Sequence, residues 1–403
     1  MQEILVQLFS GVVDMFSVAG LKSLVMFIIA GVLIYLAIKK DYEPTLLLPI
    51  GFGCILANLP GAIDAVTGLK APAALGEAGF LSVLFNAGIA NELFPVLIFI
   101  AVGAMIDFSP LLKDPSMIFF GAAAQFGIFA TFLLSLVLIP IIPGLVAEGD
   151  SDMVLKLASA IGIIGAADGP TTLFVANHFE LKDYMGPISV AAYSYMALVP
   201  VIQPPVIKAL TTKKERMIRM DYQEERCSKT TLILFPIIVT IVAGIIVPMS
   251  APLVGSLMFG NLIRECGVLE RLSKTAQNEL ANLVTIVLGI TVGGTMVADK
   301  FLHPTTALIL ILGLFAFVFD TAGGVLFAKF LNLFRKKKVN PMIGAAGISA
   351  FPMSSRVIAK MALKEDPSNF ILMQSTSANV SGQLGSIVAG GMVITLVSML
   401  LGG

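Results

Sequence analysis

The chain has 403 residues, of which 57% are hydrophobic and 13% are charged, and its formal net charge is zero. About 25% of the residues of a typical soluble domain are charged, so this composition excludes a soluble domain and indicates an integral membrane protein. Cys54, Cys227 and Cys266 are scattered without ligand spacing, and they predict neither a disulfide framework nor a metal cluster.

The first 20 residues predict an amphipathic lead-in helix. They have apolar residues at helical spacing but lack the basic region and the cleavage site of a signal peptide. Apolar runs long enough to cross a hydrocarbon core of about 30 Å recur along the rest of the chain, and they are too long for barrel strands. They predict ten transmembrane helices, at residues 21–38, 44–60, 93–108, 116–144, 186–208, 230–249, 251–266, 281–298, 304–333 and 369–400.

The distribution of basic residues gives the orientation. Lys and Arg concentrate in the connector 211–229 and in the run "RKKK" at 335–338, and this side of the membrane is therefore predicted to be cytoplasmic. The connector is interpreted as a cytoplasmic joint and not as a nucleic-acid patch. With this orientation, segments 153–178 and 341–360 enter and leave on the same side, and their Pro and Gly residues suit re-entrant hairpins.

The two hairpins are related by an internal repeat. A shift of 182 residues places "GAADGPTTLFV" over "GISAFPMSSRV" and pairs Gly165 with Gly347 and Pro170 with Pro352. The halves 21–210 and 230–403 begin in opposite directions, so the repeats are inverted. The predicted fold is therefore an all-α polytopic membrane protein with ten transmembrane helices and two re-entrant hairpins, in an elevator-like transporter architecture.

The hairpin tips are expected to meet and to carry an ion site. The first tip supplies Asp168 and Thr171, and the second supplies Ser349 and Arg356. A carboxylate, hydroxyls and freed carbonyls are hard oxygen ligands that suit Na⁺. An Asp at the centre of a membrane helix costs about 2.5–3.5 kcal/mol on insertion scales, which favours a functional role. The structural alternative is that Asp168 pairs with Arg356.

Arg356 suggests a substrate site, and three further residues extend the set. The forked guanidinium of Arg356 suits a carboxylate substrate, although a salt bridge that tethers helices is the alternative. Asn379 and Ser381 in "STSANVSGQLGS" are candidate sodium ligands, whereas such a run can also serve close helix packing. Asp320 in "FAFVFDTAGG" is a second candidate for proton or ion handling.

Four motifs carry a family resemblance: "GAADGPTTLFVAN", "AAYSYMALVPVIQPPVIKALTTKKERMIRM", "NPMIGAAGISAFPMSSRV" and "DPSNFILMQSTSANVSGQLGS". From about residue 80 onward the chain resembles the β subunit of the sodium-pumping biotin-dependent decarboxylases, which include the oxaloacetate, methylmalonyl-CoA, glutaconyl-CoA and malonate enzymes. The resemblance implies that the chain decarboxylates carboxybiotin on a separate biotin carrier and exports Na⁺ while a proton is consumed.

The resemblance also implies partners and a location. The partners are a carboxyltransferase α subunit, a biotin carrier protein or domain, a small single-span subunit of the γ or δ type, and further copies of the chain. The location is a bacterial or archaeal cytoplasmic membrane.

The family's functional residues match this sequence position by position. The implied catalytic residues are Asp168, Tyr195, Ser349 and Arg356, with Asn340, Gly344 and Arg356 at the carboxybiotin and Asp168, Thr171, Asn379 and Ser381 at the Na⁺. A Na⁺-coupled secondary transporter of a small carboxylate is the alternative function, because it would use the same repeats, cation site and arginine. A purely structural subunit is disfavoured, since a scaffold does not need two polar hairpins.

Overall fold

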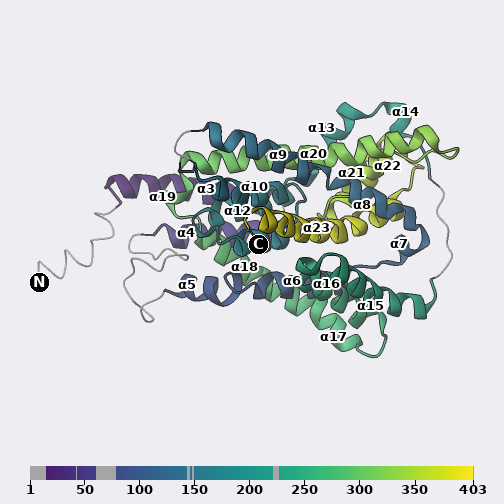
Figure 1. The fold of residues 1–403 in the computed structure, drawn as a ribbon, viewed down its shortest axis with the longest axis horizontal. Helices are drawn as coiled ribbons and strands as arrows, with labels where there is room; N and C mark the ends of the chain where they lie inside the picture. The colour runs from purple at the N-terminus through teal and green to yellow at the C-terminus, as the bar shows by residue number, and fades with distance from the viewer. Residues whose placement is uncertain are drawn as a thin grey trace, which may run out of the picture.

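The computed structural model describes residues 15–41, 43–59, 79–142, 146–147, 149–220 and 227–402, and this part of the chain is helical without strands (Figure 1). The predicted lead-in helix 1–20 lies mostly outside the described residues. The first described helix, α3 (Val18–Lys40), begins where Ser17 Oγ accepts a hydrogen bond from the amide of Gly20, and it ends with Lys39 and Lys40 in its last turn.

The first half of the chain contributes a mixture of short and long helices. After α3 they are α4 (Pro44–Ala57), α5 (Phe80–Leu84), η1 (Phe85–Ile89), α6 (Leu93–Met105), α7 (Ser109–Lys113), η2 (Pro115–Met117), α8 (Ile118–Ala124), α9 (Phe126–Leu138), η3 (Ile139–Ile141), α10 (Ser151–Ile164), α11 (Gly169–His178), η4 (Lys182–Tyr184), α12 (Met185–Ala197) and α13 (Val199–Leu210).

The second half follows a short connector helix, α14 (Lys213–Arg216). Its elements are α15 (Lys229–Ile246), η5 (Pro248–Ser250), α16 (Ala251–Glu265), α17 (Glu270–Thr275), η6 (Ala276–Leu280), α18 (Ala281–Gly294), α19 (Ala298–Phe301), α20 (Pro304–Phe334), α21 (Met342–Ala345), α22 (Met353–Glu365) and α23 (Leu372–Leu400).

Five helices of the described chain are long and apolar enough to cross a membrane, or up to seven if each of two bent pairs is one span. The predicted count of ten is not confirmed, because α4, α16 and α18 contain only 14, 15 and 14 residues. A helix of 14 residues is about 21 Å long, which is shorter than a hydrocarbon core of about 30 Å. The coarser prediction, an all-helical polytopic membrane protein, agrees with the structure.

The short helices pack in two closely matched pairs. A Cβ on Gly53 of α4 would lie 2.3 Å from the carbonyl oxygen of Ile290 in α18, and a Cβ on Gly260 of α16 would lie 2.0 Å from that of Ile100 in α6. Only glycine permits such backbone contact, which is typical of helix pairs in membranes. These crossings hold α4, α6, α16 and α18 together at one side of the molecule (Figure 1).

The two hairpins meet at their tips. The first consists of α10 and α11 with a break at residues 165–168, and the second consists of α21 and α22 with a break at residues 346–352. The backbone amide of Ser349 donates a hydrogen bond of 3.0 Å to the carbonyl of Ala166. In Figure 1, α10 lies toward the end that carries α19, whereas α22 lies toward the end that carries α14. The expected contact between the tips is therefore confirmed.

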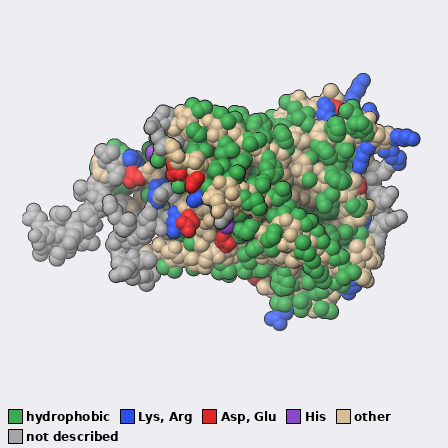
Figure 2. All heavy atoms as spheres, viewed as in Figure 1, with side chains coloured by type: hydrophobic (Ala, Val, Ile, Leu, Met, Phe, Trp, Pro, Cys, Tyr) green, Lys and Arg blue, Asp and Glu red, His purple; other side chains and the backbone are tan. Residues whose placement is uncertain are grey.

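The two ends of the molecule differ in charge. Lys and Arg side chains gather at the end that carries α14, and the opposite end carries both signs (Figure 2). At that opposite end Lys22 pairs with Asp299 at 2.8 Å. Between the two ends, the visible surface is largely hydrophobic. This distribution fits a membrane protein whose long axis in Figure 1 runs from one polar surface to the other.

Candidate ion-binding site

Asp168 is the N-cap of α11. Its Oδ1 accepts a hydrogen bond of 3.3 Å from the amide of Thr171, and its Oδ2 accepts bonds from Thr171 Oγ1 at 2.6 Å and Ser386 Oγ at 2.8 Å. Gly169 and Pro170 follow as the first two residues of the helix, where the missing N–H of proline does no harm. The break thus places a carboxylate, only 4% exposed, at the positive end of a buried helix.

The backbone before Asp168 is held in an uncommon conformation. Ala167 has φ = 53°, in the left-handed region, and its side chain is fully buried. Such a conformation costs about 1–2 kcal/mol for a residue other than glycine. Strain of this kind persists where the surrounding structure imposes it, and it is frequent at functional sites. Here it turns the chain so that Asp168 faces the second hairpin.

Two hydroxyls complete the surroundings of the carboxylate. Ser349, at the second tip, lies beside Asp168, but its hydroxyl geometry is outside that of a hydrogen bond. The ring of Tyr193 packs on Gly169, where an added Cβ would lie 2.2 Å from the ring. The Tyr193 hydroxyl is buried and has no hydrogen-bond partner among the described residues. Buried hydroxyls are ordinarily satisfied by a partner, so those of Ser349 and Tyr193 are candidates for contact with a bound ion or water.

Amide side chains hold the second tip. Asn379 Nδ2 donates to the carbonyls of Ala346 at 3.1 Å and Ile348 at 2.7 Å. Gln203 Nε2 donates to Ala345 O at 2.8 Å, and Gln125 Nε2 donates to Gly347 O at 3.3 Å. These carbonyls lie in or beside the break of the hairpin, and the amide side chains supply the hydrogen bonds that a continuous helix would otherwise give them. The opposite atoms, Asn379 Oδ1 and Gln125 Oε1, are buried without a hydrogen bond in the described chain.

The donor set fits a monovalent hard cation. It offers the Asp168 carboxylate and the hydroxyls of Thr171 and Ser386, and the described residues contain no group of three or more His, Cys, Asp or Glu that could hold a metal. Oxygen ligands suit Na⁺, Mg²⁺ and Ca²⁺, whereas imidazole and thiolate suit transition metals. A single carboxylate balances the single charge of Na⁺, so Na⁺ fits this set better than a divalent ion.

Ser381 does not belong to this group. Its hydroxyl donates to the carbonyl of Met117 at 3.0 Å and to that of Ala378 at 2.7 Å, so it faces η2. Ser386 takes its place beside Asp168. Residues five apart on an α-helix point about 140° away from each other, so Ser381 and Ser386 face different neighbours here, and Ser381 as an ion ligand stays a prediction.

Three other predicted residues lie away from the carboxylate. The hydroxyl of Tyr195 donates to the carbonyl of Leu310 and ties α12 to α20. Asn340 Nδ2 donates to the carbonyl of Arg216 at 2.9 Å, which fastens the connector to the start of the second hairpin. Gly344 packs directly on Gly324 of α20. In this conformation these three residues position helices and do not line the site.

Arg356 lies in the first turn of α22, and its side chain is exposed. No ion pair or hydrogen bond of its guanidinium is formed within the described chain. The structural alternative, an ion pair with Asp168, is not formed, because Asp168 is buried among hydroxyl donors instead.

Asp320 is fully buried in α20. Its Oδ1 accepts a hydrogen bond of 3.1 Å from the amide of Ile128, in the first turn of α9. The carboxylate thus caps a neighbouring helix where α8 and α9 are separated by Gln125. This hydrogen bond gives Asp320 a structural role. Its role in proton or ion handling stays a prediction.

Comparison with known proteins identifies the family. The family model described as the Na⁺-transporting oxaloacetate decarboxylase beta subunit matches residues 22–397. The chain belongs to this family. The match begins well before residue 80, so the first transmembrane segments belong to it as well.

Curated relatives cover almost the whole chain. The oxaloacetate decarboxylase beta chain of Klebsiella pneumoniae is 44% identical over 94% of this chain and 96% of its own length. The methylmalonyl-CoA decarboxylase beta subunits of Propionigenium modestum and Veillonella parvula are 47% and 46% identical, over 93% of this chain and 94% and 93% of their own lengths. The resemblance found in the sequence motifs is confirmed.

Proposed function

We propose that this chain is the membrane subunit of a primary sodium pump, which decarboxylates carboxybiotin on a biotin carrier and couples the release of CO₂ and the uptake of a proton to Na⁺ export. The names of its relatives support a decarboxylase over a Na⁺-coupled symporter for a small carboxylate. The observation that carries the proposal is the buried Asp168 carboxylate, which lies where the two hairpin tips touch.

Na⁺ binds between the tips in this proposal. Asp168 supplies the charge, and Thr171, Ser349 and Ser386 supply hydroxyl oxygens, with Asn379 Oδ1 as a further ligand. The hydroxyls of Thr171 and Ser386 donate to the carboxylate and keep lone pairs for the ion. An ionised carboxylate at this depth is costly without a counter-charge, so binding of the cation stabilises the charged form.

Arg356 holds the carboxylate of the incoming substrate. Carboxybiotin supplies CO₂, and its ureido nitrogen accepts a proton when the C–N bond breaks. A forked guanidinium matches a carboxylate with two parallel hydrogen bonds, and the first turn of α22 adds the positive end of a helix dipole. The exposure of Arg356 leaves it accessible to a carrier-borne group. Tyr195 acts as a positioning residue, because its hydroxyl donates to Leu310 O.

The paired hairpins form the element that couples the two events. The tips share one backbone hydrogen bond, and Gln125, Gln203 and Asn379 hold the second tip, so ion occupancy at one tip biases the position of the other. Coupling requires that Na⁺ and substrate each bind two arrangements with different affinities. The matched packing of α4 on α18 and of α6 on α16 supports an inverted repeat in which the hairpins move against these helices.

The remaining partners follow from the proposed reaction. A carboxyltransferase α subunit loads the biotin carrier, and a small single-span γ- or δ-type subunit and further copies of this chain complete the assembly. The chain lies in the cytoplasmic membrane with the connector 211–229 inside, which agrees with the basic end in Figure 2.

Reconstitution tests the proposal. The complex is incorporated into inverted vesicles, carboxylated biotin carrier is added outside, and ²²Na⁺ uptake is followed together with CO₂ release. The proposal predicts that uptake requires the carboxylated carrier and persists when ionophores remove every ion gradient other than that of Na⁺. Uptake driven by a carboxylate gradient without CO₂ release would instead identify a symporter.

A further inference from the structure

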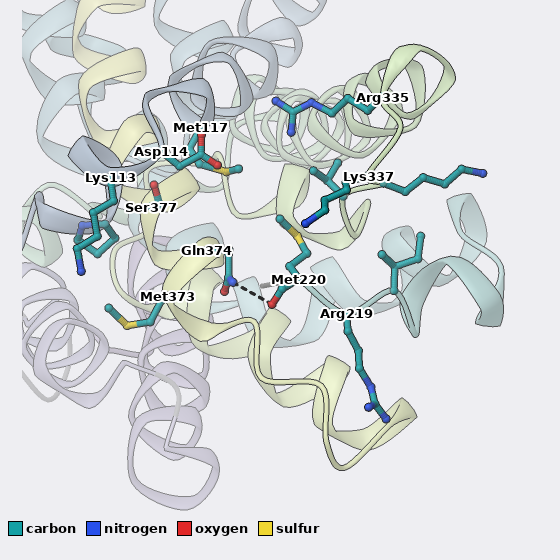
Figure 3. Close-up of a pocket in the computed structure, with 14 residues that line it drawn as sticks. Lys113, Asp114, Met117, Arg219, Met220, Arg335, Lys337, Met373, Gln374 and Ser377 are labelled. Carbon is teal, nitrogen blue, oxygen red and sulfur yellow. Dashed lines mark hydrogen bonds between the residues drawn. The ribbon is translucent and has the colours of Figure 1, made fainter. Parts of the chain in front are cut away.

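The basic end of the molecule contains a cavity of about 720 Å³, bounded by α7, the connector, the end of α20 and the start of α23 (Figure 3). One carboxylate, Asp114, lines it together with five basic side chains: Lys113, Arg219, Arg335, Lys337 and Lys338. Figure 3 shows Lys113 and Lys337 on opposite sides, with Gln374 and Ser377 between them. The Ser377 hydroxyl is 2% exposed and has no hydrogen-bond partner in the described chain.

The cavity is therefore suited to an anion. The guanidinium of Arg219 turns away to pair with Asp366 at 2.8 Å, and that of Arg335 donates to the Ser116 hydroxyl at 3.0 Å, yet the lining as a whole carries more positive than negative charge. The carboxylate of Asp114 accepts bonds from the amide and hydroxyl of Ser116 and caps η2. A basic pocket between transmembrane helices at the cytoplasmic surface is a typical place for an anionic lipid headgroup.

An apolar groove of about 410 Å³ adjoins the cavity. It lies between the α7–α8 segment, α15, α16 and α23, and every side chain that lines it is apolar. Along α15 the groove runs from Phe235 to Val247, which is about 18 Å at the rise of an α-helix. One leaflet of the hydrocarbon core is about 15 Å deep, so the groove has the length of an acyl chain.

The cavity and the groove share one wall. Lys113 and Met117 line the cavity, whereas Leu112 and Ile118, their neighbours in the chain, line the groove. A ligand that passes the edge of this wall at Lys113 would place a charged group in the cavity and an apolar chain in the groove. A basic cavity and an apolar groove thus lie on the two sides of one short segment. This arrangement distinguishes the site from a surface that only attracts anions.

We propose that this paired site binds one anionic phospholipid, with its phosphate between Lys113 and Lys337 and one acyl chain in the groove. The basic cavity at the end of the groove favours a ligand with a charged headgroup and an apolar chain over a purely apolar one. The lipid is a structural ligand, and its binding is independent of the proposed pump activity.

Native mass spectrometry of the full complex in detergent tests the site. Phosphatidylglycerol and phosphatidylcholine with the same acyl chains are compared, and glycerol phosphate serves as a headgroup without chains. The proposal predicts selective retention of phosphatidylglycerol. Lys113→Gln and Lys337→Gln should each weaken its apparent Kd about fivefold, whereas the exposed Lys208→Gln at the same end should leave it unchanged.

Groove variants test the acyl-chain half of the proposal. Ala243→Trp fills the groove and should abolish selective retention, whereas Ile245→Trp, on the exposed face of the same helix, should retain it. Val239→Phe gives a second filling variant if Ala243→Trp does not fold. Equal retention of phosphatidylcholine, full competition by glycerol phosphate, an unchanged lipid Kd in both filling variants, or a protein helix in the groove would each overturn the proposal.

Discussion

The amide of Ser349 donates a hydrogen bond of 3.0 Å to the carbonyl of Ala166, and this bond joins the tips of two hairpins from opposite halves of the chain. Asp168 lies two residues after Ala166, so a displacement of either tip changes the oxygens that surround its carboxylate. The proposed ion site and the proposed moving element would then be the same piece of structure, as coupling between an ion and a reaction requires.

The serine pair on α23 gives the first prediction. Ser386→Ala removes a 2.8 Å donor to the Asp168 carboxylate, whereas Ser381→Ala removes only bonds to backbone carbonyls. Ser386 is also a proposed oxygen ligand of the ion, so its loss should weaken apparent Na⁺ affinity about tenfold, which is about 1.4 kcal/mol. Ser381→Ala should keep the parental affinity. The Na⁺ dependence of decarboxylation measures both, and equal effects in the two variants would remove Ser386 from the site.

Arg356 gives the second prediction. Arg356→Lys keeps the charge but loses the fork, so turnover should fall about tenfold or more while apparent Na⁺ affinity stays near the parental value. Lys360→Gln, one turn further along α22 and also exposed, is the matched control and should remain active. Steady-state kinetics with carboxylated carrier distinguish the two. Parental turnover in Arg356→Lys would contradict the assigned role.

The topology gives the third prediction. In a background without native cysteines, Lys213→Cys in the connector should react with an impermeant maleimide only from the cytoplasm. Lys182→Cys, exposed at the opposite end of the molecule, should react only from outside. Labelling of both positions from one side would contradict the orientation and the inverted repeat with it.

The fourth prediction concerns pH. The Arg219 guanidinium, hydrogen-bonded to Asp366 at 2.8 Å, lowers the pKa of this carboxyl below its ordinary value of 3.8, and the amide of Ser368 adds to the effect. A lowered folded-state pKa means that the stabilisation is fully present above the unfolded pKa and is lost as the pH falls through the folded one.

Thermal unfolding of the parent and of Asp366→Asn across pH tests this sign. The difference in Tm should be small, because the Arg219 side chain is exposed to solvent. It should be constant from pH 8 to pH 5 and should vanish in more acidic solution. A difference that grows as the pH falls would contradict the assigned sign.

The sequence predicted the hairpins better than the site. Gly165 and Pro170 interrupt an apolar run, and backbone freed inside a membrane must be satisfied by protein, so the breaks and their pairing with Gly347 and Pro352 followed from local chemistry. Asp168 was also identifiable from the sequence, because a carboxylate in an apolar membrane segment needs hydrogen-bond donors or a cation to offset its burial.

The residues around Asp168 could not be chosen from the sequence. Ser381 and Ser386 lie in the same polar run, and only the rotation of α23 decides which of them faces the carboxylate. Tyr193 and Tyr195 present the same problem, because both lie on α12 and point in different directions. The predicted count of ten crossings is not confirmed, since apolar runs such as 281–298 form helices shorter than the runs themselves.

The central claim is that Asp168 binds the ion. It is tested most directly by measuring how much Na⁺ raises the Tm of the parent, of Asp168→Glu and of Asp168→Asn. If Asp168 binds the ion, the parent gains thermal stability with Na⁺, Asp168→Glu gains less at each concentration, and Asp168→Asn folds but gains almost nothing. If the carboxylate only joins the hairpin to Thr171 and Ser386, Asp168→Asn melts at a lower temperature yet keeps the full Na⁺ response. A full parental response in Asp168→Asn would contradict the assignment of the ion site.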